Sequence, residues 1–153
     1  MIKLEYENVF ERMIADLTRL ARLKAKGARF VDMRKVRLVI PPCNGGETHI
    51  HDRGGNRGMI CLQAGILLAP KGPQEWLIGS LVSYLHTKRR RRAKQLLAVQ
   101  ARVIGPEHNR LEKEYWNWRR THAAEIRGFT RSYNARMRAP IYEQHRPRQL
   151  SVP

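Results

Sequence analysis

The sequence predicts a mostly helical α+β fold, in which a small antiparallel β unit packs on amphipathic helices. Two observations support this prediction. Apolar residues recur at helical spacing over most of the chain, and two short apolar segments flank a glycine-rich stretch. With 153 residues the chain is long enough for one hydrophobic core. We therefore predict a single domain over residues 1–127, with a loop inserted at 43–58, and an irregular, arginine-rich extended tail over 128–153.

The β unit is predicted from residues 30–40 and 59–69. The first segment is β-branched and partly alternating, with Val36, Leu38 and Ile40 on one side, and two prolines follow directly, as at the end of a strand. The second segment is a short apolar run, which does not by itself distinguish a strand from a buried helix. We expect a strand that pairs antiparallel with the first.

The helices are predicted from apolar stripes and from the residues that end them. Residues 2–26 form an amphipathic stripe that Gly27 is placed to end. Pro73 suits the first turn of a long helix over 74–104, which Gly105 and Pro106 break. A last helix is expected over 107–127.

Positive charge is the most informative property of the chain. It has 30 Lys and Arg residues against 13 Asp and Glu, a formal net charge of +17. Residues 86–104 hold seven of these cations and no carboxylate, and residues 127–148 hold six arginines beside Glu143 alone. Five consecutive cations, as in 88–92, would project all around a helix and repel one another unless a polyanion lies close by. A phosphate backbone is the natural partner, because neutralising phosphates also releases condensed counterions.

The loop at 43–58 has five glycines in sixteen residues and two arginines. Such a loop can approach an RNA backbone closely and donate hydrogen bonds to it; a solvated surface loop is the alternative. If the loop contacts RNA, we expect substitution of its glycines to weaken assembly more than substitution of its histidines and cysteine. The predicted RNA-binding cations are Arg53, Arg57, Lys88, Arg89, Arg90, Arg91, Arg92, Lys94, Arg127, Arg131, Arg136, Arg138, Arg146 and Arg148.

Four residues in or beside this loop have the chemistry of metal ligands: Cys43, His49, His51 and Cys61. A His-x-His pair on a strand places both rings on one face, and two cysteines with two histidines form a legitimate zinc set. The spacing Cys-x5-His-x-His-x9-Cys nevertheless lacks the Cys-x2–4-Cys unit of most small zinc sites. From sequence alone we predict no cofactor, and zinc remains the alternative.

The sequence does not indicate an enzyme. His49, His51 and Asp52 offer a base and an orienting carboxylate, but no nucleophile motif or cofactor fingerprint accompanies them. Farther along, Tyr115 and Trp118 share one side of a helix next to Trp116 and several arginines. Aromatic residues beside cations can stack on unpaired bases, but packing is the more common use of such a stripe.

We therefore expect a structural component of a large ribonucleoprotein, namely a mitochondrial or other organellar ribosomal protein that contacts rRNA and neighbouring proteins. If the protein is not organellar, we expect it in a ribonucleoprotein of the cytoplasm. The first 26 residues contain four acids and resemble neither a secretory signal nor a transit peptide, and no apolar run reaches the roughly 20 residues of a membrane span. Two alternatives remain: an accessory subunit of a membrane-bound respiratory complex that binds anionic lipid, and a small zinc-binding protein.

Overall fold

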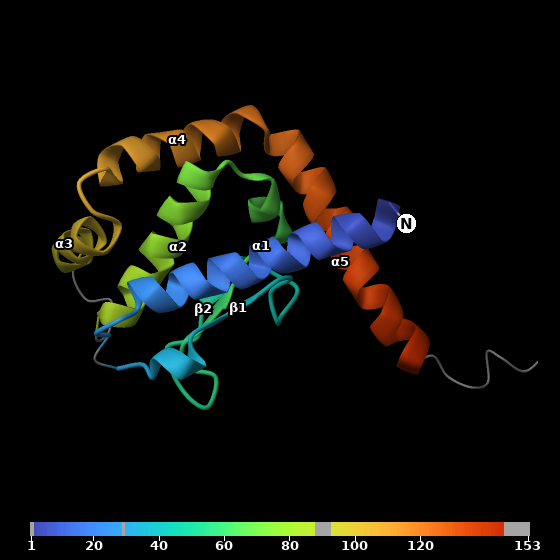
Figure 1. Cartoon of the computed structure of the whole chain (residues 1–153), viewed down its shortest axis with the longest axis horizontal. Helices are drawn as coiled ribbons and strands as arrows, with labels where there is room; N and C mark the ends of the chain where they lie inside the picture. Colours follow the sequence, from blue (N-terminus) through green and yellow to red (C-terminus); the bar gives the residue numbers. More distant parts are fainter. Residues whose placement is uncertain (1, 29, 88–92, 146–153) are drawn as a thin grey trace, which may run out of the picture.

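The computed structural model describes residues 2–28, 30–87 and 93–145, and it confirms a mostly helical α+β fold (Figure 1). Within these residues, five α-helices and two short 3-10 helices accompany a small three-stranded sheet. The α-helices are α1 (Ile2–Lys24), α2 (Lys71–His86), α3 (Ala93–Ile104), α4 (His108–Thr121) and α5 (Ala123–His145). The other elements are η1 (Met33–Lys35), β1 (Arg37–Val39), β2 (His49–Ile50), β3 (Met59–Cys61) and η2 (Ala64–Leu68).

The sheet is mixed, with strand order β1-β3-β2. β1 pairs parallel with β3, so the prediction of an antiparallel pair between these segments is wrong. The antiparallel partner of β3 is β2, which lies within the glycine-rich segment, with His49 opposite Cys61. β3 is therefore the central strand, and Ile60 and Cys61 are fully buried on it.

Both predicted strand segments are shorter than expected because 3-10 turns replace parts of them. The carboxylate of Asp32 accepts a hydrogen bond from the backbone N–H of Arg34 at 2.9 Å, which starts η1 inside the first segment. In the second segment η2 follows β3 directly and is buried against α5. A Cβ on Gly65 would lie 2.5 Å from Cγ2 of Ile126, so this close packing requires glycine.

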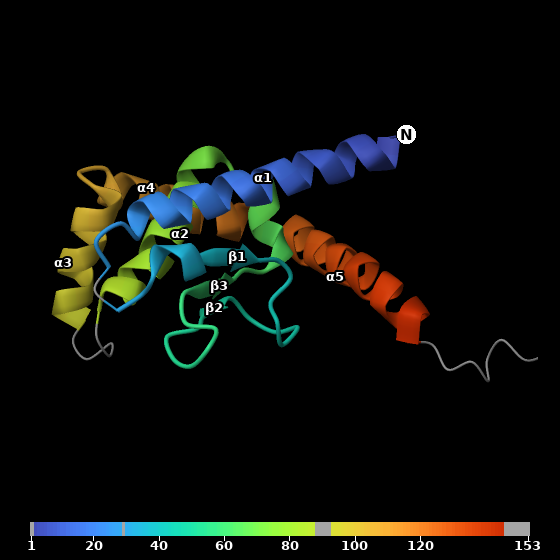
Figure 2. The ribbon, with the colours of Figure 1, turned by 60° about the horizontal axis from the view of Figure 1, so that its bottom comes forward.

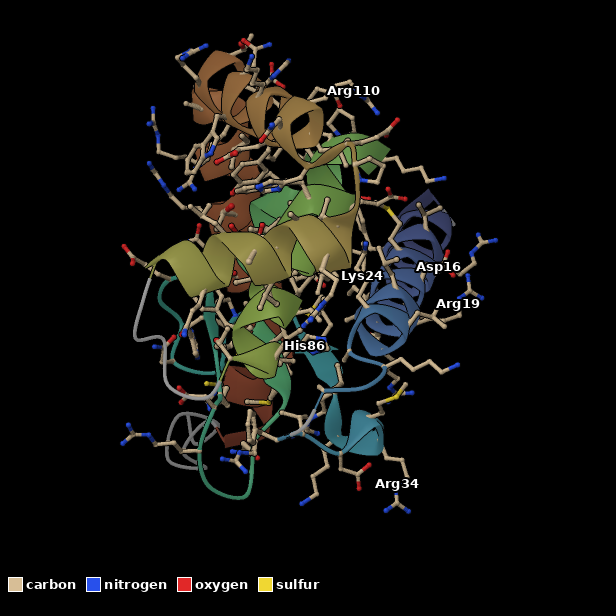
Figure 3. The ribbon with its side chains drawn as sticks, turned by 90° about the vertical axis from the view of Figure 1, so that its left-hand side faces the viewer. Asp16, Arg19, Lys24, Arg34, His86 and Arg110 are labelled. Atoms are coloured by element: carbon tan, nitrogen blue, oxygen red, sulfur yellow. The ribbon has the colours of Figure 1, made fainter. Side chains whose placement is uncertain are left out.

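The helix predicted over 74–104 is two helices. α2 ends at His86, and α3 returns alongside it, where Ile104 packs on Gly79. Two apolar stripes in one straight helix could not contact each other, and the reversal lets them do so. Lys24 and His86 meet at this junction (Figure 3): His86 Nε2 lies 3.1 Å from the carbonyl of Lys24, and Lys24 Nζ donates to the carbonyl of Val103 at 3.4 Å.

The region predicted to be an irregular tail is helical as far as the structure describes it. α4 ends at Thr121, and α5 runs through Gly128 and Pro140 to His145. The aromatic rings of Phe129 and Tyr133 lie 5.5 Å and 6.3 Å from the ring of Phe10 on α1. An irregular conformation is therefore wrong for 128–145, because this segment carries core residues; residues 146–153 lie outside the described part.

The elements form a helical body with the small sheet below α1 and α2 (Figure 2). α3 and α5 lie at opposite ends of the molecule in both views (Figures 1 and 2). Among the described helices none is long and apolar enough to cross a membrane.

Candidate functional site

Three short segments meet at the sheet and bring together four side chains that have the chemistry of metal ligands. Cys43 follows β1 in a turn that the N–H of Gly45 closes onto the carbonyl of Pro42 at 2.9 Å. His49 lies on β2, and the N–H of His51 extends the ladder by donating to the carbonyl of Met59 at 2.9 Å. Cys61 ends β3. Because His49 pairs with Cys61 across the sheet, the ladder itself sets the spacing that the sequence pattern lacked.

The four ligand atoms form one compact group and all lie within 4.8 Å of one another. His49 Nε2 and His51 Nε2 are 3.2 Å apart, as expected for alternate residues on one strand face. Cys43 Sγ lies 3.4 Å and 3.3 Å from these two nitrogens, and Cys61 Sγ lies 3.5 Å from His51 Nε2. Cys43 is exposed and Cys61 is buried, so the group spans the boundary between solvent and core.

Hydrogen bonding alone does not account for this convergence. The Nε2 atom of His51 faces three polar atoms within 3.5 Å, yet a ring nitrogen either donates one proton or offers one lone pair. A proton can satisfy one of the three contacts and leaves the other two unmatched. One cation at the centre would satisfy all of them together.

The second ring nitrogen of His49 has its own partner. Nδ1 lies 2.7 Å from the carbonyl oxygen of Glu47, which can only accept a hydrogen bond, so Nδ1 is the donor and the neutral ring directs the lone pair of Nε2 toward the cluster. This outer hydrogen bond is the arrangement that holds metal-ligating histidines in one tautomer and orientation. Burial raises the pKa of the Cys61 thiol above its ordinary value, so an unliganded thiol there stays protonated.

Directly beyond His51 the chain forms the loop that holds Arg53 and Arg57. The N–H of Gly58 donates to the carbonyl of His51 at 2.8 Å, and Arg57 Nε donates to the carbonyl of Asp52 at 3.1 Å. Both arginines are exposed. We call residues 52–58 the Gly/Arg loop; the cysteine–histidine group lies at its base.

The other predicted RNA-binding cations fall into three groups. Arg127, Arg131 and Arg136 are exposed along α5, at the far end of the molecule from α3. Lys94 lies in α3 and Arg138 lies in α5. Seven more lie outside the described residues, namely Lys88, Arg89, Arg90, Arg91, Arg92, Arg146 and Arg148.

The aromatic stripe of α4 is mainly a packing surface. Tyr115 and Trp118 are buried, and the ring of Tyr115 lies 4.7 Å from that of Trp76 on α2. Trp116 differs because 49% of it is exposed, with the guanidinium of Arg119 5.6 Å from its ring. Of these three rings, Trp116 alone keeps about half of its surface exposed, where a base could stack.

A cavity of about 350 Å³ adjoins this stripe between α2 and α4. Two buried polar atoms belong to residues on its walls, Trp76 Nε1 and Ser80 Oγ, and neither has a hydrogen-bond partner among the described residues. The sequence pattern did not reveal this cavity, because it depends on how α4 crosses α2.

Neither the sequence nor the fold matches a family model, a curated protein or a solved structure. What the site can do must therefore follow from its geometry.

Proposed function

We propose that this protein is a structural RNA-binding component of a large ribonucleoprotein. The partner is folded RNA with its phosphate backbone, and the protein supplies cations from more than one surface. The net charge of +17 is far larger than a small domain needs for solubility, and it favours association with a polyanion. A ribosomal particle of an organelle is the setting that we favour.

The observation that supports this proposal most directly is a hollow of about 420 Å³ where the Gly/Arg loop meets the end of α2. Arg53 and Arg57 line it together with Tyr84 and Thr87. Thr87 is followed in the sequence by the five consecutive cations of 88–92. Arg53 and Arg57 thus lie close to Thr87, the last described residue before the basic run, which is the arrangement that a shared phosphate-binding surface requires.

The exposed arginines of α5 favour RNA over a membrane surface. They lie at the opposite end of the molecule from α3, which follows the basic run. A planar bilayer attracts cations that share one face, whereas a folded RNA can surround a small protein and contact both ends. An accessory subunit that binds anionic lipid would need the arginines of α5 and the basic run before α3 to face the same membrane plane.

A binding experiment with the full chain tests the proposal. The dissociation constant for a folded RNA with unpaired loops is measured over a salt series and compared with binding to phosphatidylserine vesicles. We expect tighter binding to RNA and a steep salt dependence. The variant R53Q/R57Q should reduce the slope of log affinity against log salt by roughly 1.5, since each phosphate contact contributes about 0.7–0.9.

The matched control is R19Q/R34Q, which removes the same net charge from two exposed arginines that already have partners. Arg19 pairs with Asp16 at 3.0 Å and Arg34 with Asp32 at 2.9 Å (Figure 3). We expect the control to change the slope much less. Equal effects of the two variants would show a nonspecific charge response, and tighter binding to vesicles than to RNA would contradict the proposal.

A further inference from the structure

We propose that Cys43, His49, His51 and Cys61 bind one Zn²⁺ ion in a closed tetrahedral site, and that this ion fixes the base of the Gly/Arg loop. The zinc site does not depend on RNA binding. Its effect on the loop deepens the function proposed above and rests on it.

Four of the six distances among the ligand atoms are close to those of a tetrahedral zinc centre. Zinc–sulfur bonds of about 2.3 Å and zinc–nitrogen bonds of about 2.05 Å place tetrahedral ligands about 3.3 Å apart for two nitrogens and about 3.5 Å apart for nitrogen and sulfur. The two nitrogens here are 3.2 Å apart, three of the four sulfur–nitrogen distances are 3.3–3.5 Å, and all four ligand atoms lie within 4.8 Å of one another. A small closure of the group would therefore bring all four atoms to zinc-ligand radius around one central point.

The ligand types favour zinc over other common cations. Ca²⁺ and Mg²⁺ require oxygen ligands, and none of the four ligand atoms is an oxygen. Two thiolates with two imidazoles in a tetrahedral arrangement suit Zn²⁺. Two thiolates also balance the ion's charge, so the site needs no further counter-ion. With four protein ligands no position is left for water or substrate, which makes the site structural.

The ion would join segments that otherwise hold together through few contacts. Cys43 lies in the turn after β1, the histidines lie on and just beyond the two-residue strand β2, and Cys61 ends β3. β2 is too short to be stable by its ladder alone. Metal binding to such a segment is also folding free energy. Because the Gly/Arg loop begins at the residue after His51, fixing His51 also fixes the direction in which Arg53 and Arg57 leave the sheet.

The test measures metal directly in the full chain. The protein is purified without chelator, its zinc content is determined by mass spectrometry, and metal-free protein is titrated with Zn²⁺ and with Co²⁺. We expect about one zinc per chain, and a Co²⁺ complex with the visible absorption and thiolate charge-transfer bands of a tetrahedral site. The variant H49A/H51A should lose zinc. C43A should weaken zinc binding by more than about 100-fold, since loss of a mere outer-shell partner already costs roughly 10–100-fold.

The control is H122A, because His122 lies at the α4–α5 junction, away from the cluster, with Nδ1 near the carbonyl of Trp118. It should keep its zinc. Wild-type protein without stoichiometric metal and without the Co²⁺ bands would overturn the inference, as would zinc retained by H49A/H51A. A Cys43–Cys61 disulfide in the native protein, seen as two cysteines that do not react with a thiol reagent until reduced, would overturn it as well. The wild-type titration decides the question even if a variant fails to fold.

RNA binding separates the two proposals. Metal-free protein should lose most of the salt-dependent affinity contributed by Arg53 and Arg57, and added Zn²⁺ should restore it. Stoichiometric zinc in a protein that does not bind RNA would contradict the proposed function and leave the zinc site standing. RNA affinity that is unchanged on zinc removal would contradict the role of the ion in orienting the loop.

Discussion

Substitution of Cys43 by alanine separates a metal site from ordinary packing, because this ligand is exposed while its partner Cys61 is fully buried. Without metal, C43A removes few contacts and should change the free energy of unfolding by at most about 0.5 kcal/mol. With free Zn²⁺ at 1,000 times its dissociation constant, binding stabilises the wild type by about 4.1 kcal/mol. C43A loses most of that stabilisation.

For a chain of this length, 1 kcal/mol corresponds to roughly 2–4 °C in the melting temperature. Thermal unfolding followed by far-UV circular dichroism should therefore place C43A below the wild type in zinc, by up to about 8–16 °C if all of this stabilisation is lost. The two melting curves should coincide in the presence of a chelator. C61A is the informative companion, because it also opens a cavity in the core and should be less stable than the wild type under both conditions. Equal melting temperatures of wild type and C43A in zinc, or a deficit of C43A that persists in chelator, would refute the reasoning.

Four further outcomes are expected. Removal of residues 129–153 should abolish cooperative unfolding or lower its midpoint strongly, because it removes Phe129 and Tyr133 from their contacts with Phe10; an unchanged denaturant midpoint would show that α5 is dispensable. Burial raises the pKa of Tyr133, so the folded protein keeps the phenol proton above pH of about 10 while the unfolded chain releases it. Stability should therefore fall as the pH rises through that region, and Y133F should fall less steeply in chemical denaturation; parallel profiles would contradict this. G58A should destabilise the fold by more than about 1 kcal/mol, because Gly58 has a φ of +97° and its Cβ would lie 2.8 Å from Val31, whereas G55A, with open space around it, should be nearly neutral in the same assay. Neutralising Arg89 to Arg92 together should lower the salt slope of RNA binding by roughly three, and an unchanged slope would mean that these cations do not contact phosphate.

The sequence predicted the fold class and the positions of most helices, because apolar residues at helical spacing report directly on burial. It did not predict where helices reverse. The apolar stripes of α2 and α3 look continuous in sequence. Only the contact between Gly79 and Ile104 shows that the chain reverses between the two helices. The arginines and prolines around Phe129 and Tyr133 dominate the local composition and predict a tail. The burial of these two residues depends instead on α1, more than 100 residues earlier.

The candidate site shows the same limit. The four residues were identified from their chemistry, but their spacing argued against a metal, because the expected motif places ligands close in sequence. Here the ladder between β2 and β3 supplies the proximity instead, with His49 opposite Cys61. The sequence alone predicts that substitution of the loop glycines is more damaging than substitution of the histidines, but the structure constrains only some of these glycines. Gly45 and Gly54 have positive φ values, whereas Gly55 has open space around it and no such constraint. If the zinc proposal holds, substitution of the histidines and Cys43 should be more damaging than substitution of the loop glycines.

The central claim is that this chain works as a protein component of an RNA particle, and sedimentation of the native protein from its own cells tests it most directly. Lysate is resolved on a density gradient with and without ribonuclease, at low salt and without detergent, and the protein is followed by antibody. We predict that it sediments with a large particle and moves to the top of the gradient after ribonuclease treatment. A protein that stays with a large particle after ribonuclease, and is released by detergent instead, would contradict the account.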